Sequence, residues 1–277
     1  MINLIILFFK KVLNFPLRII RKMIKHFKNE IIEIFEPEST RLKFLANTYK
    51  QLNILEEREL IIKRLNSCLL SLGLPKYSED NGMYSEHLII FAGLSNSTFK
   101  PKRILELGTY LGVTTVILSK LFPDAKITTI DLKDDDPIFK NTYRRKGSLK
   151  DFIKKRNKLI KNNTKINFIQ ENSLFLTFKL KQENQDLIWV DGAHGYPVVT
   201  SDITNCLRLL SKKGILMCDD VWKSIEKSDQ MYSSIASFET LNSFSQAGII
   251  KTIFFRKRIG KKYNGNYKHV SLSKFIN

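Results

Sequence analysis

The spacing of apolar side chains changes near residue 100. Before that point they recur every three or four residues, which predicts helices over residues 41–72 and 88–94. Beyond it, short apolar runs alternate with helical segments. These runs predict five strands, namely Arg103–Leu107, Lys126–Ile130, Ile166–Gln170, Leu187–Val190 and Gly214–Cys218. With a terminal hairpin over residues 249–275, the pattern predicts an α/β fold: a doubly wound, mostly parallel seven-stranded sheet with an N-terminal helical extension.

Two breaks in the pattern divide the chain into three parts. Residues 1–40 form a basic amphipathic arm, which ends at the turn-forming stretch Glu36–Thr40. Residues 41–98 form a helical cap, and residues 99–277 form the α/β domain.

Positive charge is concentrated in a few segments. The chain has 46 Lys and Arg against 27 Asp and Glu, and residues 1–30, 140–165 and 251–277 have net charges of +6, +10 and +8. Such clusters favour an anionic partner, which is a membrane surface, a phosphorylated molecule or nucleic acid. The alternative is that the basic clusters are only solvated surface charge and bind no partner.

The N-terminal arm has the pattern of an interfacial helix. Arg18, Arg21, Lys22 and Lys25 recur at helical spacing, with apolar residues largely on the other side. Such a helix lies at a membrane surface, or it packs against the rest of the chain or a sister subunit of a homo-oligomer. The three cysteines are far apart and lack metal-ligand spacing, which favours a reducing compartment. We therefore expect a cytoplasmic protein with peripheral contact at the inner face of the membrane.

The loop after the first predicted strand has the sequence E-L-G-T-Y-L-G, from Glu106 to Gly112. Gly108 permits close backbone approach, and Gly112 permits a tight start of the following helix. The third glycine of the dinucleotide pattern G-x-G-x-x-G is missing, and an acid precedes the loop, so a diphosphate fits poorly. A cationic ligand without phosphates fits better. Asp131, at the end of the second strand, is placed to bind ribose hydroxyls.

Asn172 and Ser173 follow the third strand, where a contact to the edge of a base is expected. Together with E-L-G-T-Y-L-G and T-T-I-D, they resemble the class I S-adenosylmethionine-dependent methyltransferases, whose first motif is E/D-x-G-x-x-x-G. The resemblance implies a Rossmann-like methyltransferase fold and S-adenosylmethionine as cofactor. It also implies that Glu86, upstream of the first strand, lies near the methionine end of the cofactor.

Three carboxylates follow the fourth and fifth strands. Asp191, Asp219 and Asp220 stand at the tips of strands that are neighbours in a doubly wound sheet, about 4.8 Å apart. Carboxylates this close repel one another unless a proton or cation lies between them, and Mg²⁺ or Ca²⁺ is the cation that oxygen ligands favour. The arrangement resembles the metal-dependent O-methyltransferases related to catechol O-methyltransferase and macrocin O-methyltransferase. This implies metal-ligand roles for the three aspartates, with Asp191 also near the cofactor.

The candidate general base is His194. Catechol-type enzymes have a lysine at this position, and some sugar-methylating relatives have an aspartate where this chain has Ala193. A neutral imidazole removes a hydroxyl proton near neutral pH, although a loop-ordering hydrogen bond is the alternative role. We expect an O-methyltransferase acting on a hydroxyl of a small molecule or saccharide. The alternatives are a nucleic-acid methyltransferase, a metal-independent small-molecule methyltransferase and a binding module without turnover.

Overall fold

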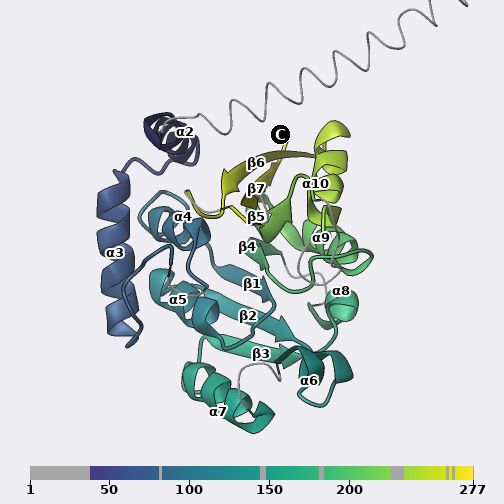
Figure 1. The fold of residues 1–277 in the computed structure, drawn as a ribbon. Helices are drawn as coiled ribbons and strands as arrows, with labels where there is room; N and C mark the ends of the chain where they lie inside the picture. Colours follow the sequence, from purple (N-terminus) through teal and green to yellow (C-terminus); the bar gives the residue numbers. More distant parts are fainter. Residues whose placement is uncertain are drawn as a thin grey trace, which may run out of the picture. The chain divides into compact units, whose positions relative to one another are not determined.

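Seven strands form one sheet in the order β3-β2-β1-β4-β5-β7-β6 (Figure 1). In chain order the strands are β1 (Arg103–Leu107), β2 (Lys126–Asp131), β3 (Ile166–Gln170), β4 (Gln185–Val190), β5 (Leu210–Trp222), β6 (Ile250–Arg256) and β7 (Lys268–Phe275). The first five pair in parallel, whereas β7 pairs antiparallel with both β5 and β6. The predicted fold class and the terminal hairpin are therefore confirmed.

The computed structural model describes residues 38–80, 83–143, 148–180, 184–225, 234–259, 262–263 and 266–276. The chain divides into two compact units, Met1–Asn47 and Thr48–Asn277, and the sheet belongs to the second. The predicted basic arm lies outside the described residues except for its last three positions, 38–40. The boundary at residue 98 stays a prediction. No helix in the described ranges is long and apolar enough to cross a membrane.

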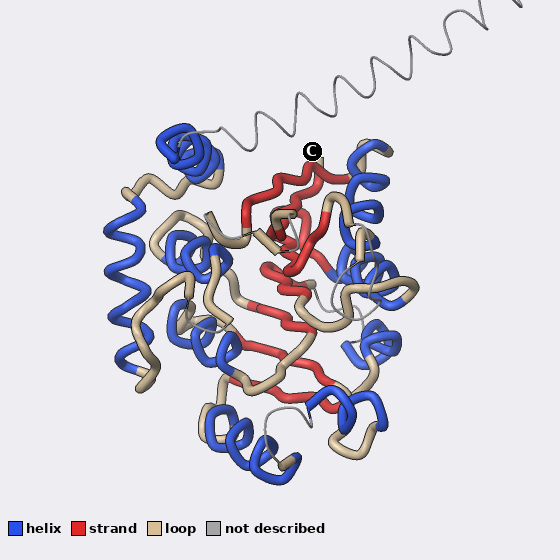
Figure 2. The backbone as a smooth tube through the Cα atoms, in the orientation of Figure 1, coloured by secondary structure: helices blue, strands red, loops and turns tan. Residues whose placement is uncertain are grey.

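Helices flank both faces of the sheet (Figure 2). One group on one face is α3 (Arg58–Ser71), α4 (Glu86–Ser95) and α5 (Val113–Leu121). The opposite face carries α8 (Leu176–Leu180), α9 (Val198–Leu209) and α10 (Ala236–Gln246), while α6 (Pro137–Tyr143) and α7 (Leu149–Ile160) lie toward the β3 edge. The central strands are covered on both faces, which explains why they read as continuous apolar runs.

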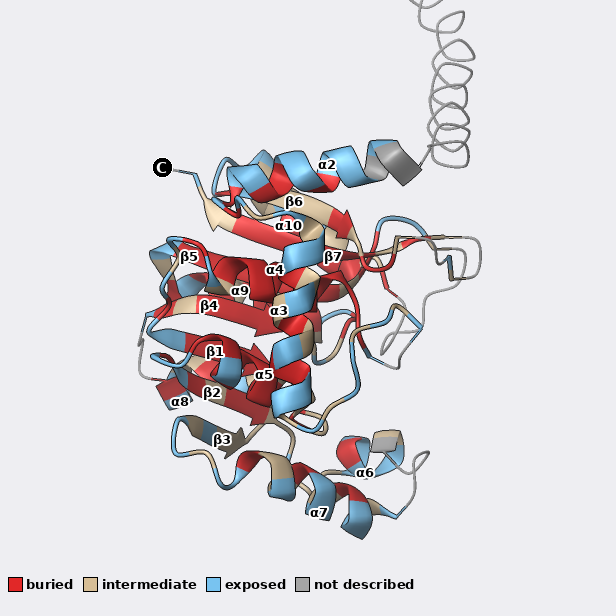
Figure 3. Ribbon diagram, turned by 90° about the vertical axis from the view of Figure 1, so that its left-hand side faces the viewer, coloured by how far each residue is buried: buried red, intermediate tan, exposed pale blue. Residues whose placement is uncertain are grey.

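The core lies between the sheet and these helices, where the strands and α4 are largely buried (Figure 3). Almost every residue of helix α4 is buried, which explains why the helix is apolar on nearly all sides and has no polar face. The predicted helix over residues 41–72 is wrong in one respect: α2 (Glu38–Gln51) ends before α3 begins. Asn53 adopts a left-handed backbone, with φ of 58°, between them. Asparagine tolerates that conformation, and a chain turn there ends the helix.

Candidate functional site

The carboxyl ends of the parallel strands surround a cavity of about 750 Å³. Because parallel strands end at the same edge of the sheet, the loops that follow them meet there. Eight of the predicted site residues line this cavity: Gly108, Asp131, Asn172, Ser173, Asp191, His194, Asp219 and Asp220. The remaining three predicted residues, Glu86, Glu106 and Gly112, do not line it.

The tips of β1 and β4 are packed against each other at Gly108. Its φ is +96°, and a Cβ atom there would lie 2.1 Å from the backbone oxygen of Asp191. The Asp191 amide donates to the Leu107 carbonyl at 2.8 Å, so the two tips are also hydrogen-bonded. Only glycine combines this backbone conformation with so close an approach.

Asp131 stands at the end of β2 and holds the same loop. One carboxylate oxygen accepts a hydrogen bond from the Tyr110 amide, and the other accepts one from the Leu132 amide, both at 2.8 Å. Burial raises the pKa of Asp131, while these two amides lower it. Each carboxylate oxygen has two lone pairs, so the group can still accept hydrogen bonds from a ligand in the cavity.

Glu106 and Gly112 do not line the cavity, and their predicted contact with a cofactor stays untested. The Glu106 carboxylate is buried and accepts hydrogen bonds from the hydroxyls of Thr115 and Thr129. Gly112, with φ of +77°, is the N-cap residue before α5, and a Cβ atom there would lie 2.5 Å from the Ile160 side chain. Both residues shape the loop because they tie it to the helix and the sheet.

Glu86 also lies outside the cavity lining, and its predicted contact with the cofactor stays untested. Its side chain is fully buried and forms a two-pronged ion pair with Arg58, at 2.5 and 2.7 Å, while the Tyr49 hydroxyl donates to it. As the first residue of α4, it lies beside Arg58 at the start of α3, so its charge is balanced within the protein.

One end of the cavity contains Asn172, Ser173 and a residue that sequence reasoning missed, Asp202 on α9. Asn172 caps a short 3₁₀ helix by accepting from the Leu174 amide at 3.0 Å. Asp202 is 1% exposed, and burial raises its pKa to about 6, opposed by a hydrogen bond with Ser173. In sequence it looks like any polar residue of an amphipathic helix, so only the packing of α9 against this loop distinguishes it.

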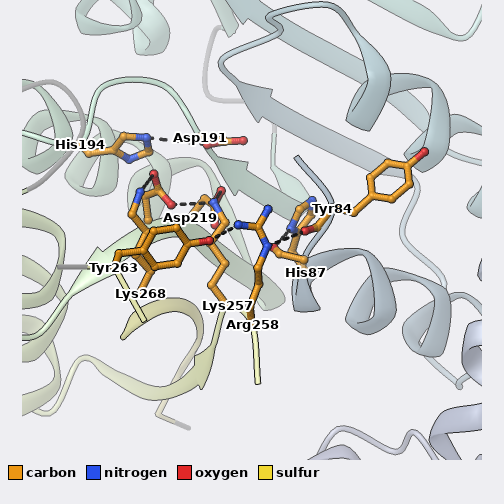
Figure 4. Close-up of polar contacts among 11 residues, drawn as sticks. Tyr84, His87, Asp191, His194, Asp219, Lys257, Arg258, Tyr263 and Lys268 are labelled. Carbon is orange, nitrogen blue, oxygen red and sulfur yellow. Dashed lines mark hydrogen bonds and ion pairs between the residues drawn. The ribbon is translucent and has the colours of Figure 1, made fainter. Parts of the chain in front are cut away.

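At the other end, two lysines neutralise the acids that follow β5 (Figure 4). Lys257 Nζ donates to Asp219 Oδ2 and, at 2.6 Å, to Asp220 Oδ1. Lys268 Nζ donates to Asp220 Oδ2 at 2.7 Å. Both lysines were missed because they lie in a lysine-rich tail more than 35 positions from their partners.

These contacts bear directly on the predicted metal site. Across the described residues, no group of three His, Cys, Asp or Glu side chains is placed to hold a metal ion. Three of the four carboxylate oxygens of Asp219 and Asp220 instead accept hydrogen bonds from ammonium groups. The side chains as arranged do not fit a divalent cation, and the metal-ligand roles of Asp191, Asp219 and Asp220 stay predictions.

His194 and Asp191 face each other beside this cluster. His194 Nε2 lies 3.8 Å from Asp191 Oδ1, and the imidazole is buried. Burial lowers the pKa of His194, which keeps the ring neutral near pH 7. Burial, followed by the charge of Asp219, raises the pKa of Asp191. Two groups that can accept a proton therefore stand together at the cavity wall.

The strand order, with β7 inserted antiparallel beside β5, agrees with the Rossmann-like methyltransferase fold that the sequence predicts. Residues 105–221 match the family described as a methyltransferase domain. The matched residues extend from β1 to β5, so this part of the chain is similar to a methyltransferase domain.

No curated protein matches the chain significantly. Among solved structures, cofactor-bound Rv0187 from MTB is 15% identical and has a TM-score of 0.49, with 84% of this chain and 94% of that one covered. The O-methyltransferase TomG from Streptomyces achromogenes, in complex with SAM, is 14% identical, with a TM-score of 0.46 and coverage of 78% and 90%. An O-methyltransferase from Bacillus cereus, in complex with SAH, is 12% identical, with a TM-score of 0.47 and coverage of 78% and 91%.

Proposed function

We propose that the enzyme transfers the methyl group of S-adenosylmethionine to a hydroxyl oxygen of a small molecule or saccharide. The observation that carries this proposal is the position of His194, a buried imidazole that lines the same cavity as the β1 loop. A hydroxyl attacks a methyl group effectively only when its proton is removed, and a neutral imidazole is suited to accept it.

In this proposal the cofactor spans the cavity from Ser173 to Gly108. Asp131 accepts hydrogen bonds from the ribose hydroxyls, and Asn172 and Ser173 contact the base. The backbone at Gly108 and Asp191 lies against the methionine portion. This order follows the order of the strand tips β3, β2, β1 and β4 across the sheet.

The acceptor then enters beside His194, with its oxygen in line with the methyl group and the sulfur. The hydroxyl proton passes to the imidazole, the oxygen–carbon bond forms, and the carbon–sulfur bond breaks with its electron pair retained by sulfur. Asp191 shares the proton-accepting role, since its raised pKa makes it a better base than an ordinary carboxylate. Most of the rate enhancement comes from holding the cofactor and the acceptor in the orientation that the transfer requires.

The rim of the cavity indicates the kind of acceptor. Met83, Ile138 and Tyr196 line the cavity and are about half exposed, with values of 54%, 53% and 45%. An apolar rim favours an organic molecule that buries some hydrocarbon on binding. A phosphate-rich polymer gains little from it.

The test is a methylation assay over catechols, glycosides and RNA, with product mass as the readout. We expect a hydroxyl acceptor to be methylated, and His194→Asn to lower kcat by about 100-fold or more without changing S-adenosylhomocysteine affinity. His269→Asn is the matched control, because His269 is also buried but does not line the cavity. Methylation of RNA alone, or full activity in His194→Asn, would refute the proposal.

A further inference from the structure

The end of β5 is irregular in a way that brings two consecutive carboxylates to one ammonium. Side chains at successive strand positions point to opposite faces of a sheet. Here the register with β7 shifts between Cys218 and Val221, and Asp220 adopts a left-handed φ of 49°. A non-glycine residue rarely takes this conformation, so the surrounding contacts must hold it. Its effect is that Asp219 and Asp220 both accept hydrogen bonds from Lys257.

Lys257 is held firmly on its own side. It directly follows β6, and its amide donates to the Lys268 carbonyl at 2.8 Å. Its carbonyl accepts from the Glu86 amide at 3.0 Å, which fixes the backbone to the start of α4. The side chain is 8% exposed, and the residue lines the cavity. A buried ammonium fixed in this way is a preorganised charge rather than a mobile surface lysine.

The charges of this cluster already balance. Asp219 and Asp220 supply two negative charges, and Lys257 and Lys268 supply two positive ones. A divalent ion placed among them would leave an uncompensated excess of two positive charges in a buried site, which is costly. Burial lowers the pKa of Lys257, but the two aspartates raise it more, so the ammonium stays charged.

We propose that the Lys257 ammonium is the resident cation of the acceptor site and binds the acceptor oxygen in place of a divalent metal. The inference rests on the proposed transfer to a hydroxyl. An ammonium has three N–H donors, and two are engaged by Asp219 and Asp220 among the described residues. The third is available to the acceptor oxygen.

Asp219 contributes a second polar group to this subsite. Its Oδ1 atom is buried and has no hydrogen-bond partner within the described parts of the chain, although the residue lines the cavity. Buried oxygens without a partner are uncommon, and a ligand donor is one way to satisfy them. A hydroxyl both donates and accepts, so the Lys257 N–H and Asp219 Oδ1 together match an alcohol. During transfer, Lys257 stabilises the negative charge that develops on the acceptor oxygen while the proton moves to His194.

The first test measures metal binding and does not depend on knowing the acceptor. Calorimetry with Mg²⁺, on protein saturated with S-adenosylhomocysteine, is expected to show no binding to the wild type. Lys257→Met leaves Asp219 and Asp220 with one cation fewer and is expected to gain a Mg²⁺ site. Lys213→Met, an exposed lysine on the same strand as the two aspartates, is the control and gains none. Wild-type Mg²⁺ binding that Asp219→Asn abolishes would overturn the proposal.

The second test uses the acceptor identified by the methylation assay. Wild-type activity is expected to persist after EDTA treatment, and Lys257→Met is expected to lose about 100-fold in kcat with unchanged S-adenosylhomocysteine affinity. Lys257→Arg should recover part of the loss, because it restores the charge.

If the single variant Lys257→Met does not fold, the double variant Lys257→Met/Asp219→Asn replaces it. The double variant removes one positive and one negative charge, so the net charge of the cluster is unchanged. That double variant should bind S-adenosylhomocysteine and remain inactive; activity near the wild-type level would overturn the role of Lys257. Failure of every hydroxyl acceptor with the wild type would refute the proposed function and leave the calorimetric result to decide the metal question separately.

Discussion

A single added methyl group at Gly108 tests whether the β1 and β4 tips are packed as closely as described. In Gly108→Ala the new Cβ atom would lie 2.1 Å and 2.6 Å from the carbonyl oxygen and carbon of Asp191, and 2.9 Å from the Gly192 nitrogen. All three are backbone atoms, so no side chain can rotate away to make room. The two tips must separate, although the hydrogen bond from the Asp191 amide to Leu107 joins them.

The expected loss of stability has three parts. A left-handed backbone costs an alanine about 1–2 kcal/mol, overpacking costs about 1–3 kcal/mol, and the weakened hydrogen bond costs about 1 kcal/mol. The free energy of unfolding should therefore fall by about 3–6 kcal/mol. Gly248→Ala is the matched control, since Gly248 has φ of +72° but nothing within 4 Å of its Cβ position. It should lose only about 1–2 kcal/mol.

Urea denaturation followed by tryptophan fluorescence measures both variants, because Trp189 and Trp222 are buried in β4 and β5. Calorimetry with S-adenosylhomocysteine on the folded fraction should show weaker binding for Gly108→Ala and unchanged binding for Gly248→Ala. Equal losses of stability in the two variants would refute the close approach. Unchanged cofactor affinity in Gly108→Ala would refute the placement of the cofactor against this loop.

Three further changes separate ligand contacts from structural ones. Asp131→Asn removes the charge that accepts the ribose hydroxyls, so S-adenosylhomocysteine should bind about 10-fold to 100-fold more weakly by calorimetry; equal affinity would contradict the ribose assignment. Glu86→Gln leaves Arg58 without its charged partner, so the free energy of unfolding measured in urea should fall by about 3 kcal/mol, with cofactor affinity unchanged. A folded variant that binds the cofactor weakly would instead support direct contact between Glu86 and the cofactor. Burial raises the pKa of Glu106 to about 7 from its usual 4.5. The folded state therefore holds that proton more tightly, so the contribution of Glu106 to stability is fully present below pH 4.5 and is lost as pH rises through 7. Glu106→Gln should remove up to about 3 kcal/mol of this dependence, measured without cofactor; an unchanged pH profile would contradict the burial of a carboxyl there.

Much of the fold follows from patterns within short stretches of sequence. The predicted strands Arg103–Leu107 and Ile166–Gln170 have the observed bounds. Arg103–Leu107 is a central strand and is buried after its first residue, which explains its apolar run. Ile166–Gln170 lies at the edge of the sheet and is only partly buried. The loop from Gly108 and the acid Asp131 could also be placed, since the end of a parallel strand determines the edge of the sheet at which they lie. The break at Asn53 was missed because helical periodicity continues on both sides of it.

The chemical environment of the acids could not be predicted in the same way. The sequence places Asp219 and Asp220 at the tip of β5, but the cation beside them depends on how β6 and β7 pair with that strand. The pairing brings Lys257 within hydrogen-bonding distance of a carboxylate 38 positions away. Glu86 likewise is paired with Arg58 by the packing of two helices. Local sequence pattern governs which segments become strands and where their polar ends lie, whereas long-range packing decides which opposite charge each buried acid meets, because contacts between distant segments leave no periodic trace in the chain.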